Sequence, residues 1–180
     1  MSAIGQTMRA ALEAVLSDKD QEYQSSARQF EPEKRLCERD YTIIDMLNSK
    51  GHESVCFCVC DPDLKDMPII FSSDGFCDFT GYSHEEIEGK NCRFLQGTET
   101  STEDVDRIRK AIKEQKEECV NLLNYRKDGS SFINEFFISP LLDDNEKLAY
   151  FIGVQCSVPK KGPGQMPSNA GWVYSQGNHA

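Results

Sequence analysis

The sequence is short of positive charge, of long apolar stretches and of histidine. Acidic residues outnumber basic ones by 30 to 20, and the formal net charge is -10. This balance argues against a nucleic-acid backbone or an anionic membrane surface as the main partner. No run reaches the roughly 20 apolar residues that a membrane span needs. The first residues carry no basic segment followed by an apolar one, so we expect no secretory signal and a soluble, cytoplasmic protein.

Cysteine is plentiful, but the spacings typical of metal sites are missing. The eight cysteines include no CxxC pair, and the three histidines form no ligand spacing with them. In an intracellular protein such a set does not indicate disulfides. Cys56, Cys58 and Cys60 alternate along a strand-like run and would share one face. We expect no metal there and interpret most of the cysteines as small buried hydrophobic residues.

Two amphipathic helices are predicted ahead of the main domain. Residues 3–17 and 32–48 place apolar side chains at helical spacing, and the second segment opens with Pro32 and a Glu-rich first turn. The polar stretch between them is typical of a linker. Neither helix could form a core alone, so we expect their apolar stripes to pack on the main domain or on a second copy of the chain. Residues 1–53 are thus predicted to be an N-terminal helical extension.

Residues 54–158 alternate short strands and helices and form the predicted main domain. Strands are predicted at 54–60, 68–73, 118–126, 131–142 and 147–158, and helices at 75–79, 83–88, 91–96 and 102–115. Ser83 opens a capping box, and the Asp128-Gly129 and Asp143-Asp144-Asn145 stretches predict hairpin turns. The order predicts an α+β fold, a five-stranded antiparallel sheet with helices on one face. Residues 159–180, rich in Pro, Gly and Ser, are predicted to be a disordered tail.

Polar residues interrupt three of the apolar strands. Asn124, Asn134 and Gln155 each sit in an otherwise apolar run, although a buried polar group costs free energy unless it is paired. Each amide alone could simply bond to backbone, but together they could present donors and acceptors to a flat heterocycle. Arg93 and Arg109 could hold a phosphate, although a solvated surface charge is the ordinary reading of a single arginine.

The most unusual stretch is residues 89–97, Gly-Lys-Asn-Cys-Arg-Phe-Leu-Gln-Gly. It places the thiol of Cys92 between an amide and a guanidinium, in a short segment bracketed by glycines. Packing alone does not explain that combination, so we interpret the stretch as part of a functional site.

With these residues in place, residues 54–158 closely resemble a LOV (light-oxygen-voltage) domain, the flavin-binding, blue-light-sensing branch of the PAS fold. Residues 89–97 are similar to the signature of that family throughout their length. The resemblance extends to Asp61-Pro62, to residues 68–71, 80–83 and 151–155, and to Asn124-Tyr125. It implies a PAS/LOV fold flanked by the N-terminal helices.

The resemblance also implies a role for each matching position. Cys92 resembles the cysteine that forms a reversible adduct with flavin carbon C4a, and Gln155 the residue that relays the signal. The amides around the flavin head group would be Asn91, Gln96, Asn124, Asn134 and Gln155. Arg93 and Arg109 would anchor a phosphate, which favours flavin mononucleotide (FMN) over FAD or riboflavin. The remaining lining would be Cys58, Cys60, Leu95, Val105, Ile108, Ile112, Leu122, Phe136, Ile138, Phe151 and Gly153.

Several positions depart from the common pattern of the family. Cys58 and Cys60 stand where a β-branched residue and a threonine are frequent. Met67 replaces a frequent asparagine near the ribityl chain, and Ile133 stands where tryptophan is common. None of these departures removes a member of the photochemical set.

The implied function is that of a blue-light sensor whose adduct changes the bonding of Gln155 and thereby helix packing or dimerisation. A homodimer, or docking of the N-terminal helices, and a further effector protein or domain are the partners we expect. One alternative is a PAS-type ligand-binding or interaction module without photochemistry. Another is a thiol enzyme in which His84 approaches Cys92 in space. No acyl-transfer motif is present, so we expect the chain not to be an enzyme.

Overall fold

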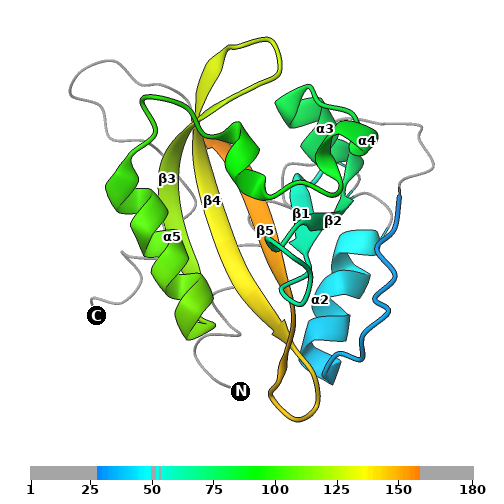
Figure 1. Cartoon of the computed structure of the whole chain (residues 1–180). Helices are drawn as coiled ribbons and strands as arrows, with labels where there is room; N and C mark the ends of the chain where they lie inside the picture. The colour runs from blue at the N-terminus through cyan, green and yellow to red at the C-terminus, as the bar shows by residue number, and fades with distance from the viewer. Residues whose placement is uncertain (1–27, 50–51, 53, 159–180) are drawn as a thin grey trace, which may run out of the picture.

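The fold is built on one antiparallel sheet. The computed structural model describes residues 28–49, 52 and 54–158. The strands are β1 (Phe57–Cys60), β2 (Ile69–Ser72), β3 (Glu118–Tyr125), β4 (Ser131–Leu142) and β5 (Leu148–Val158). They form a five-stranded sheet in the order β2-β1-β5-β4-β3 (Figure 1). The predicted α+β fold is confirmed, and β5 lies at the centre of the sheet, between β1 and β4.

Two tight turns fix the register of the last three strands. In the β3–β4 hairpin the Arg126 N–H donates to Ser130 O at 2.9 Å, and Gly129 takes a left-handed conformation with φ of 83°. Glycine suits this position because it has no Cβ to clash there. In the β4–β5 hairpin the Asp143 N–H donates to Lys147 O at 2.9 Å. Both turns were predicted from the sequence and are confirmed.

Four helices lie between β2 and β3 in the chain and cover one side of the sheet, which we call the inner face. They are α3 (Asp74–Thr80), α4 (His84–Ile87), the 3-10 helix η1 (Cys92–Leu95) and α5 (Thr102–Glu114). Ser73 and Ser101 cap α3 and α5 by accepting backbone N–H bonds. The capping box predicted at Ser83 is present, with the Glu86 carboxylate accepting from the Ser83 N–H. Local capping therefore defines where these helices begin.

The opposite, outer face of the sheet is covered by residues that precede the main domain. Helix α2 (Glu38–Asn48) and the extended segment before it run alongside β1 and β2 (Figure 1). Ile44 and Leu47 of α2 belong to one buried cluster with Val59 of β1 and Ile152 of β5. The expectation that this N-terminal region packs on the main domain is confirmed for α2.

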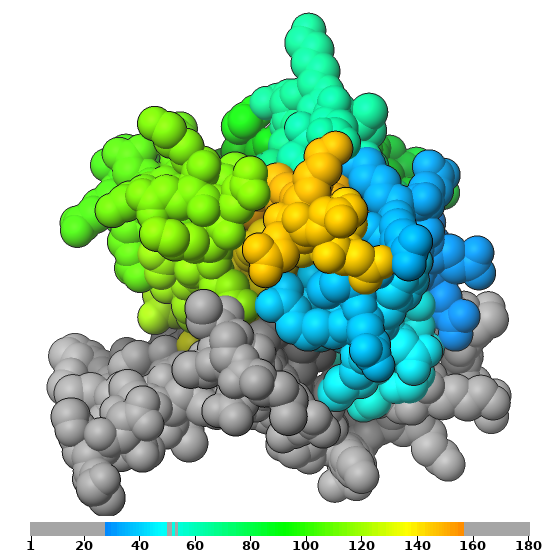
Figure 2. Space-filling view, turned by 90° about the horizontal axis from the view of Figure 1, so that it is seen from below, coloured from blue at the N-terminus to red at the C-terminus, as the bar shows by residue number. Residues whose placement is uncertain are grey.

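Helix α2 begins later than the sequence predicted. Pro32 does not start a helix, because the helix begins at Glu38. The Cys37 N–H instead donates to Leu142 O at 2.8 Å, and the Leu142 N–H donates to the buried Asp40 carboxylate at 2.6 Å. This exchange joins the start of α2 to the end of β4, and Figure 2 shows the orange β4–β5 hairpin against the blue N-terminal residues.

Further bonds close residues 28–48 into a unit that we call the N-terminal clasp. The Asn48 amide bonds to both backbone groups of Phe30, at 3.0 and 2.8 Å. The Lys34 N–H donates to the Tyr150 hydroxyl at 2.8 Å, and the Lys34 ammonium pairs with Asp61. The clasp is thus tied both to itself and to β5.

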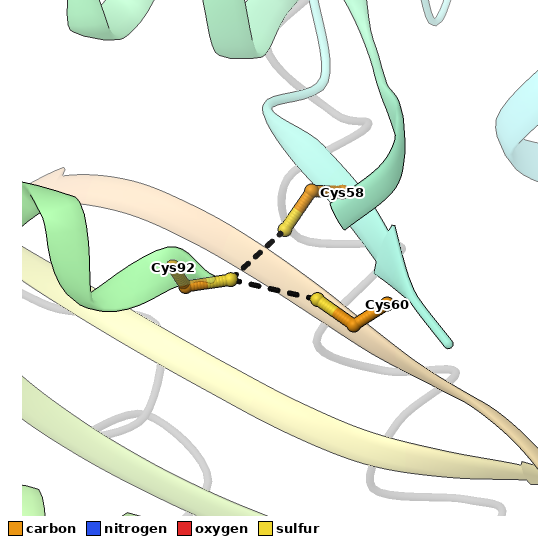
Figure 3. A group of neighbouring side chains, drawn as sticks. All are labelled: Cys58, Cys60 and Cys92. Carbon is orange, nitrogen blue, oxygen red and sulfur yellow. Dashed lines mark hydrogen bonds between the residues drawn. The ribbon is translucent and has the colours of Figure 1, made fainter. Parts of the chain in front are cut away.

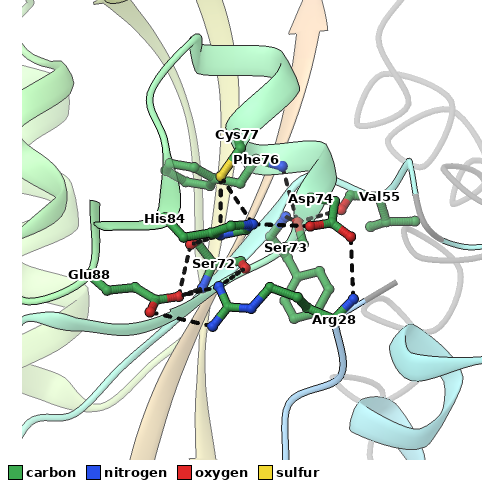
Figure 4. Close-up of polar contacts among 10 residues, drawn as sticks. Arg28, Val55, Ser72, Ser73, Asp74, Phe76, Cys77, His84 and Glu88 are labelled. Atoms are coloured by element: carbon green, nitrogen blue, oxygen red, sulfur yellow. Dashed lines mark hydrogen bonds and ion pairs between the residues drawn. The ribbon is translucent and has the colours of Figure 1, made fainter. Parts of the chain in front are cut away.

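Arg28 opens the clasp and joins it to α3, β2 and α4 (Figure 4). Its guanidinium donates to Glu88 Oε1 at 2.7 Å, and its N–H donates to Asp74 Oδ2 at 3.3 Å. Glu88 Oε1 also accepts from the Ser72 hydroxyl at 3.0 Å. Burial alone raises the pKa of Glu88, but the bonds from Arg28 and Ser72 outweigh burial, so the pKa lies below 4.5.

Strand β1 is shorter than the predicted 54–60 strand. The Ser73 hydroxyl donates to Val55 O at 2.7 Å and accepts from the Phe57 N–H at 3.0 Å. Gly75 packs so closely beneath that a Cβ there would lie 2.7 Å from Val55 O. Because the start of α3 uses these backbone groups, regular strand pairing begins at Phe57.

Two predictions cannot be compared with the structure. The helix predicted at 3–17 and the tail predicted at 159–180 lie outside the described residues. No helix in the described part of the chain is long and apolar enough to cross a membrane.

The Arg28–Glu88 contact predicts a pH-dependent contribution to stability. We expect Glu88→Gln to lower the free energy of unfolding by about 1 kcal/mol at pH 7. A carboxylate whose folded pKa is lowered stabilises the protein above its unfolded pKa, and this stabilisation disappears as the pH falls through the folded pKa. The difference between wild type and variant should therefore shrink below pH 4.5, as measured by urea unfolding.

The matched control is Glu103→Gln, which removes an exposed carboxylate on α5. It should change the free energy of unfolding by less than about 0.5 kcal/mol. A difference for Glu88→Gln that stays constant from pH 7 to pH 3 would contradict the assignment.

Candidate functional site

A cavity of about 440 Å³ lies between the inner face of the sheet and helices η1 and α5. Its volume falls in the range of sites for small organic ligands. The structure brings together every residue that the sequence assigned to the site. Those residues are Cys58, Cys60, Asn91, Cys92, Arg93, Leu95, Gln96, Val105, Ile108, Arg109, Ile112, Leu122, Asn124, Asn134, Phe136, Ile138, Phe151, Gly153 and Gln155.

The connection between β1 and β2 adds lining residues that were not assigned from the sequence. They are Pro62, Leu64 and Asp66, and they join Met67, which the family resemblance had already placed near the ribityl chain. Asp66 and Met67 both have positive φ, at 70° and 47°, a conformation that is uncommon outside glycine. This local backbone geometry turns the loop toward the cavity, and the sequence indicated it only through the position of Met67.

The three amides predicted on neighbouring strands lie side by side in the cavity wall. Asn134 of β4 donates from Nδ2 to Asn124 Oδ1 of β3 at 2.9 Å. Asn134 Oδ1 is buried and has no hydrogen-bond partner among the described residues. A buried acceptor without a partner is uncommon and costs roughly 1–3 kcal/mol. The wall is therefore suited to a ligand that donates a hydrogen bond at this point.

Gln155 of β5 is the third amide and has only weak partners. Its Oε1 accepts from the Cys56 thiol at 3.7 Å, and its Nε2 lies 4.0 Å from Cys58 Sγ. Thiols are poor hydrogen-bond groups, while Gln155 is 3% exposed. Both ends of this amide can therefore gain stronger bonds from a polar ligand.

The apolar part of the wall depends on a glycine. A Cβ on Gly153 of β5 would lie 2.7 Å from the Phe136 ring and 3.4 Å from Cys58 Sγ. The missing side chain lets the Phe136 ring approach the β5 backbone closely. Val105, Ile108 and Ile112, spaced along one side of α5, form the facing wall. A flat aromatic ligand fits between two apolar surfaces of this kind.

Asn91 positions Cys92 at the edge of the cavity. Asn91 caps η1 by accepting from the Arg93 N–H at 3.1 Å. Its Nδ2 donates to Asp66 O at 2.7 Å. Asn91 lines the cavity, but both ends of its amide already contact backbone, so it holds η1 against the β1–β2 loop.

The Cys92 sulfur lies beside two other thiols (Figure 3). Cys92 Sγ is 3.5 Å from Cys60 Sγ and 3.9 Å from Cys58 Sγ. Hydrogen bonds from Cys58 and Cys60 lower the pKa of Cys92 well below 9.0, although burial opposes this. The contact with Cys60, then the contact with Cys92 and burial, raise the pKa of Cys58 well above 9.0. For Cys60 the contact with Cys58 lowers the pKa, but the contact with Cys92 and burial outweigh it, so its pKa is raised.

The two arginines lie at the rim of the cavity. Arg93 donates to both carboxylate oxygens of Asp66, at 2.8 and 2.6 Å, and Arg109 pairs with Asp106 at 2.7 Å. Both guanidinium groups are exposed, with side-chain exposures of 58% and 71%. They can exchange these surface partners for a ligand anion at little cost, since exposed ion pairs are worth about 1 kcal/mol or less.

His84 does not approach Cys92. It lies instead beside Cys77, whose sulfur is 3.2 Å from His84 Nδ1, and it contacts Asp74 at 3.0 Å (Figure 4). Burial raises the pKa of Cys77 to about 11, so this thiol is not activated as a nucleophile. No histidine lines the cavity among the described residues, so the approach of His84 to Cys92 that the thiol-enzyme alternative required is not observed.

The burial of the cysteines corrects one expectation from the sequence. Only Cys56, Cys58 and Cys60 of the eight are buried, whereas Cys119 is exposed and the others are intermediate. The three buried cysteines lie on one face of β1 and of the residue before it, as the alternation predicted.

Comparisons with known proteins all point to the same family. Residues 54–156 match the profile of the PAS domain. Phototropin-2 of Oryza sativa subsp. japonica is 54% identical over 112 residues, which are 62% of this chain and 12% of that protein. The blue-light photoreceptor of Listeria monocytogenes is 50% identical over 113 residues, 63% of this chain and 44% of that protein. The chain thus spans less than half the length of these relatives.

Solved structures agree with the sequence relatives. The dark structure of the blue-light photoreceptor Aureochrome1 LOV is 36% identical, with a TM-score of 0.62 over 84% of this chain and 98% of that one. The structure reported as "Flavin Analogue Sheds Light on Light-Oxygen-Voltage Domain Mechanism" is 37% identical, with a TM-score of 0.64 over 77% of this chain and 96% of that one.

The thiol cluster predicts an order of chemical reactivity. In the reduced, ligand-free protein at neutral pH, iodoacetamide should modify Cys92 before Cys58 and Cys60, because only Cys92 has a lowered pKa and partial exposure. Peptide mass spectrometry over a time course measures the three rates. In urea the three rates should converge, and a native rate for Cys58 or Cys60 equal to that of Cys92 would refute the prediction.

Proposed function

This chain belongs to the PAS domain family, in its LOV branch, and we propose that it is a blue-light photoreceptor that binds a flavin in the cavity. The observation that carries the proposal is the placement of one thiol, Cys92, opposite a wall of three buried amides. A module that only binds a ligand needs such amides but has no need of a thiol held at the ligand edge. Residues 54–158 would be the sensor, with residues 1–53 as an extension and 159–180 as a tail.

The residues of the wall fit the polar edge of a flavin ring. That edge carries carbonyl acceptors and one ring N–H donor. Asn134 Oδ1, which has no partner within the described protein, can accept from the N–H, and the amide nitrogens of Asn124 and Gln155 can donate to carbonyls. Binding would then remove the energetic penalty of the unpaired oxygen.

The rim favours FMN among the flavins. Arg93 and Arg109 line the same cavity, and a guanidinium binds phosphate through paired N–H donors. A single terminal phosphate could contact both, whereas riboflavin would leave them unused. Asp66 and Asp106, their present partners, would then share the two arginines with the phosphate.

The proposed photochemistry uses Cys92 as the reacting group. A bound flavin supplies blue-light absorption, an electrophilic carbon C4a and a neighbouring basic nitrogen N5. Cys92 would supply the sulfur for a bond to C4a and the proton for N5, and in the dark the sulfur–C4a bond would break and Cys92 would take the proton back. Cys58 and Cys60, which can donate to the Cys92 sulfur, would stabilise negative charge on it during the transfer.

Strand β5 offers a route from the cavity to the N-terminal clasp. Gln155 faces the cavity, while its neighbours Val154 and Ile152 belong to the cluster that includes α2. A change of N5 from acceptor to donor would make Gln155 exchange the ends of its amide. We assign the output to altered packing of the clasp or to dimerisation, either of which could recruit an effector. We assign no enzymatic reaction to the chain. We place the protein in the cytoplasm.

An absorbance spectrum before and after blue light tests the proposal. The purified protein should be yellow, should bleach under blue light and should recover in the dark. Cys92→Ala should remain yellow and lose the reversible bleaching, because the sulfur that bonds to C4a is gone. The matched control Cys77→Ala removes a half-buried thiol outside the cavity and should bleach as wild type does.

Either of two outcomes would reject the assignment. Reversible bleaching in Cys92→Ala would remove Cys92 from its role. A yellow wild-type protein that does not bleach would favour the alternative, a PAS-type ligand-binding or interaction module without photochemistry.

The signalling route predicts a second effect. Light should increase amide hydrogen exchange in residues 38–48, and Gln155→Leu should reduce this increase several-fold when it is normalised to the fraction of adduct formed, because leucine cannot exchange hydrogen bonds. The matched control is Gln96→Leu, which alters an amide of the same cavity that lies on the loop after η1 and away from β5. An equal loss in both variants would argue against a specific route through β5.

A further inference from the structure

Three thiols meet at one corner of the cavity, and we infer that they form a binding site for a soft metal ion, with copper(I) as the ion of best fit. The ligands are Cys58 and Cys60 of β1 and Cys92 of η1 (Figure 3). The site extends beyond the proposed photoreceptor function, because it requires neither flavin nor light.

The spacing of the sulfur atoms matches a metal ion at their centre. All three lie within 4.8 Å of one another, and the two contacts of Cys92 measure 3.5 and 3.9 Å. Metal–thiolate bonds of about 2.3 Å, the length known for zinc, place three trigonal sulfurs about 4.0 Å apart. Small side-chain rotations would therefore bring the cluster to coordination geometry.

The elements that hold the cluster are rigid. Cys58 and Cys60 are 0% and 4% exposed and alternate on β1, which pairs with strands on both sides. Cys92 is fixed from the other side by the Asn91 cap on η1. The three ligands thus converge from two elements before any ion is bound, so little ordering entropy is lost on binding.

The donor set selects copper(I) over harder ions. Thiolates and thioethers prefer soft ions such as copper(I) and zinc. No histidine or carboxylate completes the group among the described residues, whereas zinc usually takes four protein ligands in closed sites. Met67, another soft sulfur donor, lines the same cavity. A three-sulfur site with a thioether nearby suits copper(I) better than zinc.

Binding exchanges protons for the ion without electron transfer. Each thiolate–copper bond that forms releases one proton from sulfur to solvent, and copper stays in the +1 state. The charge of the ion stabilises the thiolates, as a coordinated metal does in general. Arg93, which lines the same cavity, places a further positive charge nearby.

Copper(I) on Cys92 would compete with the light reaction. The sulfur that binds the ion is the one that the proposed adduct requires, so a chain can respond to light or hold the metal through Cys92 but not both. This consequence rests on the proposed function, whereas the metal site itself does not.

The full chain, reduced and flavin-free, tests the site in the dark under anaerobic conditions. Copper(I) is titrated against bicinchoninate, a competing chelator whose copper(I) complex is coloured. We expect one ion per chain, with X-ray absorption showing sulfur-only coordination by three or four atoms. Zinc(II) should bind more weakly in a parallel titration. A two-sulfur environment, or binding no tighter than in a variant that lacks all three thiols, would overturn the site.

Single substitutions assign the ligands. Cys58→Ser, Cys60→Ser and Cys92→Ser should each weaken copper(I) binding at least about tenfold. Cys77→Ser and Cys119→Ser remove thiols outside the cluster and should change the affinity less than about twofold. If circular dichroism shows that a cluster variant does not fold, the number of sulfur ligands in the wild-type protein, measured by X-ray absorption, tests the site instead.

A last arm uses the flavin-loaded protein. Copper(I) added in the dark should reduce the amplitude of bleaching, and a chelator should restore it. Loss of light sensitivity in every sample would reject the photoreceptor proposal and leave the copper titration unaffected. Tight copper binding without any effect on bleaching would remove Cys92 from the ligand set.

Discussion

The two faces of β5 carry the constraint on which the rest of the structure depends. Side chains along a strand alternate between faces, so Phe151, Gly153 and Gln155 face the cavity while Tyr150 and Ile152 face the clasp. β5 is central and paired on both sides, so a shift of one residue would exchange the two sets. The tight β4–β5 turn and the long ladder with β4 hold that register.

The cavity wall is a local departure from the rules that stabilise the rest of the domain. Elsewhere on the inner face apolar side chains pack closely, but at the ends of β3, β4 and β5 three amides stand together with an unpaired oxygen on Asn134. Such an arrangement lowers the stability of the ligand-free protein, and a ligand that pairs with the amides gains that free energy on binding. The cavity wall also needs a glycine at position 153, because a Cβ there would clash with the Phe136 ring that lies against the backbone.

Much of the site could be read from the sequence because its residues belong to short local patterns. Residues 89–97 form one turn and one 3-10 helix, and the amides recur at fixed positions in strands with clear alternation. The start of α2 could not be predicted, since it depends on a bond between Cys37 and Leu142, far apart in the chain. The approach of Cys60 to Cys92 has the same origin, because only the packing of η1 on β1 brings them together.

The bonds of the N-terminal clasp hold it to the rest of the domain at both ends. Asp40 and Cys37 attach the start of α2 to Leu142, and Asn48 ties the far end of α2 to Phe30. These two ties make α2 and the extended segment before it one closed loop, and the bond from Arg28 to Glu88 holds the start of that loop to the domain. The clasp cannot move as a whole without breaking bonds at one of these ends, so the strength of those bonds would set the threshold that a change in β5 must exceed before a message leaves the domain.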